Sequence, residues 1–132
     1  MGVSCFEDLR VWQEAKRLSD EIGTLIRRPA LRQDLSLREQ LNGAVISIMA
    51  NIAEGFVRGR HKEFAQFGRI AAGSNGEVRS LVHAAHGRGY VSDDERDRLL
   101  DSTDRIGGML RRLIQSLEHQ PSRSSIVPCT KD

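Results

Sequence analysis

The chain has 132 residues, of which 39% are hydrophobic, 29% charged and 5% aromatic, and its formal net charge is +2. This length is typical of one domain, and the composition excludes collagen-like, disulfide-rich and wholly disordered proteins. The scarcity of aromatic residues argues against a β-sandwich or barrel. No apolar run approaches the roughly 20 residues that a membrane-spanning helix needs.

The start of the chain has no basic segment followed by a long apolar one, so it does not resemble a secretory signal. The two cysteines, Cys5 and Cys129, stand near opposite ends and form no metal-binding motif. We therefore expect a cytoplasmic protein with two free thiols and no association with membranes.

Four segments repeat their apolar residues with the period of an α-helix. Three of them begin near a serine with a glutamate three positions later, which is the pattern of a capping box. These pairs are Ser4 with Glu7, Ser36 with Glu39 and Ser92 with Glu95. Pro29 is expected to stop the first helix. The expected helices cover residues 6–28, 37–57, 61–86 and 93–118.

Short connections between these helices favour antiparallel neighbours. The sequence therefore predicts an all-α protein, an up-down-up-down four-helix bundle that occupies residues 1–120. Residues 121–132 contain two prolines and show no period, so we expect a disordered tail there.

The second expected helix is apolar on two sides. One stripe contains Leu41, Val45, Ile48 and Ile52, and the other contains Ile46, Met49, Ala53 and Phe56. A helix of this kind must be covered on two sides. It is either the central helix of the bundle or also part of a subunit interface, and we expect a homo-oligomer.

Motifs for catalysis and cofactor binding are missing. The chain has no Glu-x-x-His pair of the kind used by di-iron bundles, no Walker loop and no nucleophile elbow. His83 and His86 share one helical face, but no carboxylate at ligand spacing accompanies them. A solvated pair near a helix C-terminus explains these histidines better than a metal site. We therefore predict no enzyme, no metal and no other cofactor.

Two pairs of polar residues are spaced one turn apart on two neighbouring helices. They are Asn51 with Glu54 and Ser74 with Glu77. The structural interpretation is a buried hydrogen-bond network that fixes the register of the helices. The functional interpretation is a pair of carboxylates for acid–base catalysis. The structural interpretation is preferred, because no nucleophile, base or metal ligand joins these residues.

Basic residues gather between the second helix and the end of the third. The loop at residues 57–62 is the densest part, and its position at a helix N-terminus suits phosphate binding. A solvated charged loop is the alternative interpretation. The candidate nucleic-acid-binding residues are Arg58, Arg60, Lys62, Arg69, Arg79 and Arg88.

Several motifs together resemble a known family. They are residues 6–9 (Phe-Glu-Asp-Leu), residues 51–55 (Asn-Ile-Ala-Glu-Gly) and residues 70–77 (Ile-Ala-Ala-Gly-Ser-Asn-Gly-Glu). Over residues 5–118 the chain resembles the four-helix bundle proteins encoded by intervening sequences of bacterial 23S rRNA genes. It is also similar to the accessory variability proteins of diversity-generating retroelements.

This resemblance implies an antiparallel four-helix bundle that forms a homopentamer and has no enzymatic activity. For the retroelement relatives it implies binding to nucleic acid and to a reverse transcriptase through a basic surface. The sequence thus predicts a non-enzymatic oligomeric bundle that binds RNA or other nucleic acid as a scaffold or accessory factor. The alternative is a purely structural or protein-interaction module without affinity for nucleic acid. No small-molecule substrate is evident.

Overall fold

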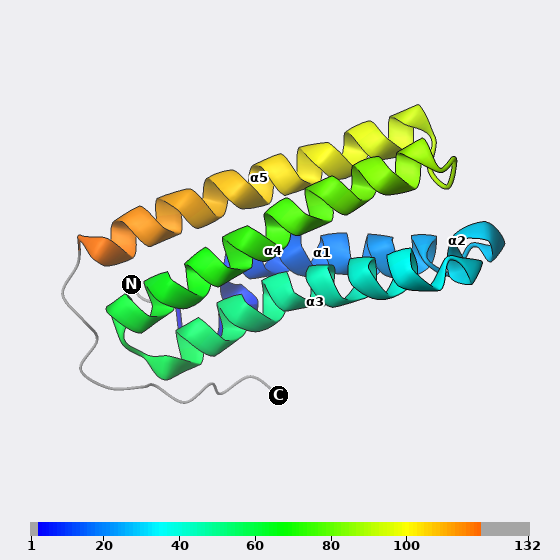
Figure 1. Cartoon of the computed structure of the whole chain (residues 1–132). Helices are drawn as coiled ribbons and strands as arrows, with labels where there is room; N and C mark the ends of the chain where they lie inside the picture. Colours follow the sequence, from blue (N-terminus) through cyan, green and yellow to red (C-terminus); the bar gives the residue numbers. More distant parts are fainter. Residues whose placement is uncertain (1–2, 120–132) are drawn as a thin grey trace.

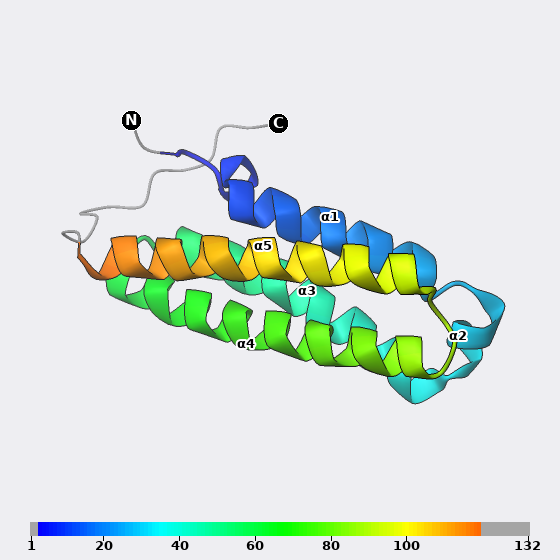
Figure 2. The same cartoon turned by 90° about the horizontal axis from the view of Figure 1, so that it is seen from above.

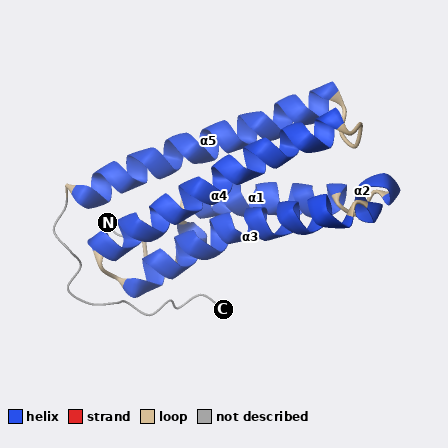
Figure 3. Ribbon diagram, in the orientation of Figure 1, coloured by secondary structure: helices blue, strands red, loops and turns tan. Residues whose placement is uncertain are grey.

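The computed structural model describes residues 3–119, and every regular element in that range is helical (Figures 1 and 3). The elements in chain order are η1 (Phe6–Asp8), α1 (Arg10–Leu25), α2 (Pro29–Gln33), α3 (Leu35–Arg58), α4 (His61–Gly87) and α5 (Asp93–Glu118). The prediction of an all-α chain with four long helices is confirmed. The tail predicted at residues 121–132 lies outside the described residues.

The long helices pack as a bundle in which successive members run in opposite directions (Figures 1 and 2). Helix α4 packs extensively on both α3 and α5, whereas α1 packs mainly on α3 and more lightly on α5. The main core lies between these helices. Its largest fully buried side chains are Leu18, Ile22, Leu31, Leu41, Ile48, Ile52, Leu99, Ile106, Leu110, Val45, Val78 and Val82.

A second, smaller core closes the end of the bundle at which α3 turns into α4. Phe56 and Phe64 meet edge to face with ring centroids 6.0 Å apart, a favoured geometry for aromatic pairs. Leu117 of α5 packs against them. The turn itself needs Gly59, whose φ of 79° lies in the left-handed region and ends α3 as a C-terminal glycine does.

The first predicted helix is divided into two elements, η1 and α1, and a short helix that was not predicted, α2, follows it. Ser4 and Glu7 do not form a capping box, because the chain makes a single 3-10 turn from Phe6 to Asp8 and is extended again at Leu9. Pro29 starts α2 rather than only stopping α1. Proline suits the first helical position, because its fixed φ fits a helix. Its lack of an N–H group costs nothing there, since an N–H at this position has no partner within the helix.

Helix α3 begins at Leu35, two residues earlier than predicted, because Asp34 is its N-cap. The Asp34 carboxylate accepts a hydrogen bond from the backbone N–H of Leu37 at 3.3 Å. Ser36 therefore lies inside the first turn, where its hydroxyl accepts from Gln40, and the predicted box with Glu39 is wrong. The box of Ser92 and Glu95 at the start of α5 is confirmed.

Two further expectations concern association with membranes and the state of the cysteines. None of the helices described here is long and apolar enough to cross a bilayer. Cys5 is buried and is not a free thiol, which corrects the expectation for this residue. Cys129 lies outside the described residues.

Candidate functional site

The basic loop between α3 and α4 is partly neutralised by carboxylates. Arg58 lies 3.3 Å from a Glu54 oxygen and 3.4 Å from a Glu63 oxygen, and its guanidinium stacks 5.1 Å from the ring centre of Phe67. Arg60 approaches Glu63 at 3.9 Å. Two carboxylates thus oppose the charges of this loop.

Arg60 and Lys62 are the most accessible cations of this loop. The Arg60 side chain is 77% exposed. Lys62 is exposed and has no ion pair within residues 3–119. Both stand at the N-terminal turn of α4, where no side chain caps the helix. These two residues can reach an anion without first breaking a close ion pair.

Arg69 and Arg79 connect α4 to α5 rather than project freely. Arg69 pairs with Glu118 near the end of α5. Arg79 pairs with Asp104 at 2.5 Å and donates to the Thr103 hydroxyl at 2.9 Å. Both arginines therefore help to hold two helices together.

Arg88 is at the opposite end of the bundle from Arg58, because α4 spans the whole length between them (Figure 1). Arg88 donates to the Asp34 carboxylate at 2.8 Å, and the Tyr90 hydroxyl donates to the same carboxylate at 2.9 Å. The hydrogen bond from Tyr90 is the main reason that the pKa of Asp34 is lowered, and the same bond raises the pKa of Tyr90. The six predicted basic residues thus do not form one continuous surface.

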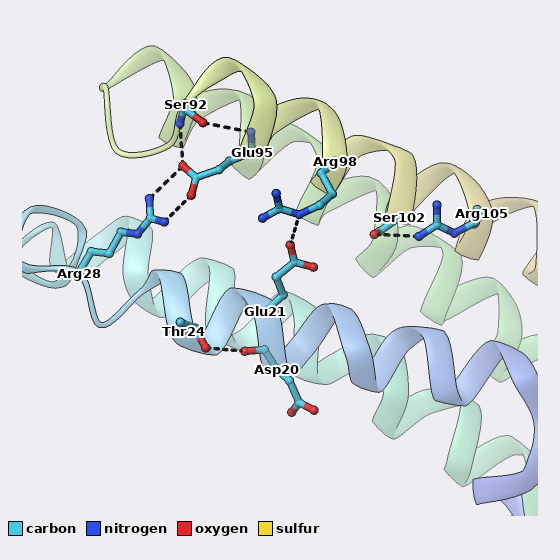
Figure 4. Close-up of polar contacts among 9 residues, drawn as sticks. All are labelled: Asp20, Glu21, Thr24, Arg28, Ser92, Glu95, Arg98, Ser102 and Arg105. Atoms are coloured by element: carbon cyan, nitrogen blue, oxygen red, sulfur yellow. Dashed lines mark hydrogen bonds and ion pairs between the residues drawn. The ribbon is translucent and has the colours of Figure 1, made fainter.

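The same end of the bundle carries polar contacts that join α5 to α1 and to the turn between α1 and α2 (Figure 4). Arg28 pairs with Glu95, whose carboxylate also accepts from the backbone N–H of Ser92 at 2.8 Å. The hydrogen bond from Arg28 lowers the pKa of Glu95 to about 2, with a further contribution from Ser92. One turn further along α5, Arg98 donates to Glu21 at 2.7 Å.

The predicted polar network is only partly assembled. The hydroxyl groups of Ser47 and Ser74 are 2.8 Å apart across the contact of α3 with α4, and the Asn51 amide donates to the Ser47 hydroxyl at 3.0 Å. Glu54 and Glu77 are exposed, and Glu54 pairs with an arginine one turn along its own helix. The structure therefore brings Asn51 and Ser74 together through a serine that sequence reasoning missed.

The two histidines considered as a metal half-site, His83 and His86, have different surroundings. His86 lies 2.6 Å from the Asp93 carboxylate and 3.3 Å from the Arg96 guanidinium, whereas His83 is exposed. The hydrogen bond to His86 lowers the pKa of Asp93. Within residues 3–119, no three side chains of the metal-ligating types come together.

An open apolar groove of about 460 Å³ lies between α1, η1 and α3. Its lining is Phe6, Trp12, Lys16, Ser19, Asp20, Ile46, Met49, Ala50 and Ala53. Lys16 and Asp20 pair with each other at 2.8 Å, so the two charges in the lining compensate. We refer to this feature as the α1–α3 groove.

Sequence reasoning found one wall of the groove and missed the other. The second apolar stripe of the predicted helix, with Ile46, Met49 and Ala53, is the α3 wall. Phe6 and Trp12 contribute the opposite wall, with ring centroids 5.2 Å apart. A signal for the α3 wall is present in the sequence, since residues 40–53 contain no charged side chain.

The fold and this surface define a class of protein: an all-helical antiparallel bundle with an open apolar groove and, at the predicted basic positions, arginines that are mostly ion-paired. The chain belongs to the 23S rRNA-intervening sequence protein family, whose model matches residues 7–112. The match runs from η1 through most of α5 and includes both walls of the groove, apart from Phe6. The family predicted from the sequence motifs is thus confirmed. No curated protein matches the chain.

Proposed function

We propose that this protein is a non-enzymatic scaffold that assembles with further copies of itself through the face carrying the α1–α3 groove. The groove is the observation that carries the proposal. Its walls leave Trp12 and Met49 only partly buried, and Ile46 is 46% exposed. Burial of apolar surface contributes about 25 cal/mol per Å², so covering this groove would stabilise the complex with a partner.

The charge distribution supports the same conclusion. Charged residues make up 29% of the chain, yet residues 40–53 of α3 contain none. The centres of protein–protein interfaces are depleted of charge in this way, and contiguous exposed apolar patches mark interaction surfaces. The resemblance described above implies a pentamer, which is the assembly we expect.

Light scattering after size-exclusion chromatography tests this proposal. The wild-type protein should elute with a mass about five times the 14.8 kDa of one chain. Ile46→Glu should reduce this mass to that of one chain without loss of helicity, because a carboxylate would be desolvated in the groove. Ser36→Glu adds the same charge at an exposed position of α3 that lies outside both the groove lining and residues 40–53, and it should leave the assembly intact. A wild-type mass of one chain at micromolar concentration would contradict the proposal.

A second candidate function is weak, sequence-independent RNA binding at the N-terminal turn of α4. It is supported by the exposure of Arg60 and Lys62 beside the uncapped helix start, where backbone N–H groups and the helix dipole favour phosphate. The family's description names 23S rRNA. An oligomer would present this turn several times, so that weak contacts add through avidity.

The salt dependence of RNA binding tests this second function. Each phosphate contact contributes about 0.7–0.9 to the slope of log affinity against log salt. Changing Arg58, Arg60 and Lys62 to glutamine together should flatten that slope and weaken binding to every RNA alike. Arg17→Gln removes an exposed arginine on α1 and should change neither quantity. If the wild-type protein retains no RNA at about 50 mM salt, this second function is wrong.

A further inference from the structure

The shape of the α1–α3 groove restricts how two copies can meet. The groove is a hollow of about 460 Å³, and two hollows that face each other would enclose a void. Voids forfeit the packing contacts that stabilise an interface. If the protein self-associates as proposed above, the groove therefore needs a protruding apolar side chain from a different face of the neighbouring copy.

Few side chains in residues 3–119 can fill this role. Besides Ile46 of the groove itself, the exposed large hydrophobic residues are Val3, Leu35, Val57 and Ile70. On a helix, the residues three and four positions away are the surface neighbours of a side chain. These neighbours decide whether burial of the side chain would also desolvate a charge.

Three of the four candidates stand beside charged residues. Leu35 has Arg38 and Glu39 at these positions, and Val57 has Glu54 and Arg60. Val3, before the first helical turn, is four residues from Glu7. Insertion of any of these side chains into an apolar groove would bring a charge to its rim or interior, at a cost in desolvation.

Ile70 on α4 differs from them. It is 45% exposed, and its neighbours at these positions are Gln66, Phe67, Gly73 and Ser74, none of which is charged. A Cβ added to Gly73 would meet no atom within 4 Å, so the surface beside Ile70 is low and open. Ile70 therefore has no charged neighbour at these positions of α4, although the Arg58 guanidinium of α3 stacks on one of them, Phe67, and Ile70 is not part of the groove lining.

We propose that Ile70 of one copy inserts into the α1–α3 groove of the next, where it packs between Trp12, Ile46 and Met49. The groove is large enough to take the Ile70 side chain with part of the adjoining turn of α4, which the glycine at position 73 keeps narrow. The contact joins two different faces, so it is a head-to-tail interface. Repetition of such a contact closes into a ring when the rotation between copies permits it.

Complementation between two variants tests this geometry. Ile70→Glu removes the protruding side chain but keeps the groove, and Ile46→Glu blocks the groove but keeps Ile70. Each variant alone should have the mass of one chain. An equimolar mixture should form a dimer with one of each, because one functional groove then meets one functional Ile70 and further growth is blocked at both ends.

The outcomes distinguish this inference from the proposed function. A monomeric wild-type protein would overturn both. An oligomeric wild type whose Ile70→Glu variant still assembles, or two monomeric variants whose mixture stays monomeric, would overturn only the head-to-tail contact. Leu35→Glu places the same charge on another exposed aliphatic residue, which is 54% exposed and whose helical neighbours are outside the groove lining, and it should assemble normally. If Ile70→Glu loses helicity, Ile70→Ser replaces it in the same mixture.

Discussion

Gly55 of α3 lies so close to Phe64 of α4 that a Cβ at position 55 would stand 2.8 Å from the Phe64 Cδ1 atom. The same Cβ would stand 2.8 Å from the Cβ of Phe67 and 3.3 Å from the Cα of Phe64. Two of these atoms, a Cβ and a backbone Cα, cannot move without shifting α4. The absence of a side chain at Gly55 therefore sets how closely α3 and α4 approach near their connecting turn.

Gly55→Ala should consequently destabilise the protein. Alanine is favoured over glycine in a helix by roughly 1 kcal/mol, but overpacking at this contact should cost more, about 1–3 kcal/mol. Denaturation by urea should show a lower midpoint with an unchanged slope. Gly23→Ala is the matched control, since a Cβ at Gly23 would meet nothing within 4 Å, and it should be neutral or stabilising. A Gly55→Ala variant as stable as Gly23→Ala would show that the contact can relax.

The ion pair of Glu95 with Arg28 predicts a loss of stability in acid. The pKa of Glu95 is lowered from 4.5 to about 2, so the folded state favours its ionised form. The stabilisation is fully present above pH 4.5 and is lost as the pH falls towards 2. Glu95→Gln should lower the free energy of unfolding at neutral pH by about 1–2 kcal/mol.

The same variant should depend less on pH in this acid interval than the wild type. Glu39→Gln is the control, because Glu39 is exposed and has no ion pair among the described residues. Parallel stability curves for the wild type and Glu95→Gln between pH 4.5 and 2 would contradict the assignment of this acid sensitivity to Glu95.

Tyr90 offers a direct spectroscopic test of its bond to Asp34. It is the only tyrosine in the chain, so phenolate absorbance reports on it alone. The hydrogen bond to the Asp34 carboxylate raises its pKa, and the titration midpoint should lie above the ordinary value of about 10. Asp34→Asn keeps a good N-cap residue for α3 but removes the negative charge, and it should lower the midpoint. An unchanged midpoint would show that the two side chains are not bonded in solution.

Trp12 should report on coverage of the groove. It is the only tryptophan in the chain and lies in the groove wall. If a second copy covers the groove, dilution below the assembly concentration should shift its fluorescence emission to longer wavelength as water regains access. Ile70→Glu should show the shifted emission at every concentration. Emission from the wild type that does not change while the mass falls to one chain would place the interface elsewhere.

The parts of the fold that local patterns encode were predictable from the sequence. The start of α5 follows from Ser92 and Glu95, whose reciprocal hydrogen bonds need only residues three positions apart. The same pattern failed at Ser36, because Asp34 is two residues earlier and provides a competing acceptor. A local motif therefore identifies a helix start only when no other capping residue is adjacent.

The surface could not be predicted in the same way, because its contacts join distant positions. Arg69 and Glu118 are 49 residues apart in the sequence, and Arg79 and Asp104 are 25 apart. The sequence made these arginines candidates for nucleic-acid binding, whereas the fold pairs them with carboxylates of α5. The α3 wall of the groove was predictable from its period, but the contribution of Trp12 depends on how α1 docks.

The light packing of α1 on α5 has a consequence for the order in which the molecule opens. Helix α1 packs chiefly on α3, and its ion pair with α5, between Glu21 and Arg98, joins positions 77 residues apart in the chain. Its backbone amides should therefore exchange with solvent sooner than those of α3 and α4. Because the groove exists only while α1 is docked, a copy bound in it would also hold α1 in place. Assembly and protection of the α1 amides from exchange are thus thermodynamically linked, and each should rise with protein concentration.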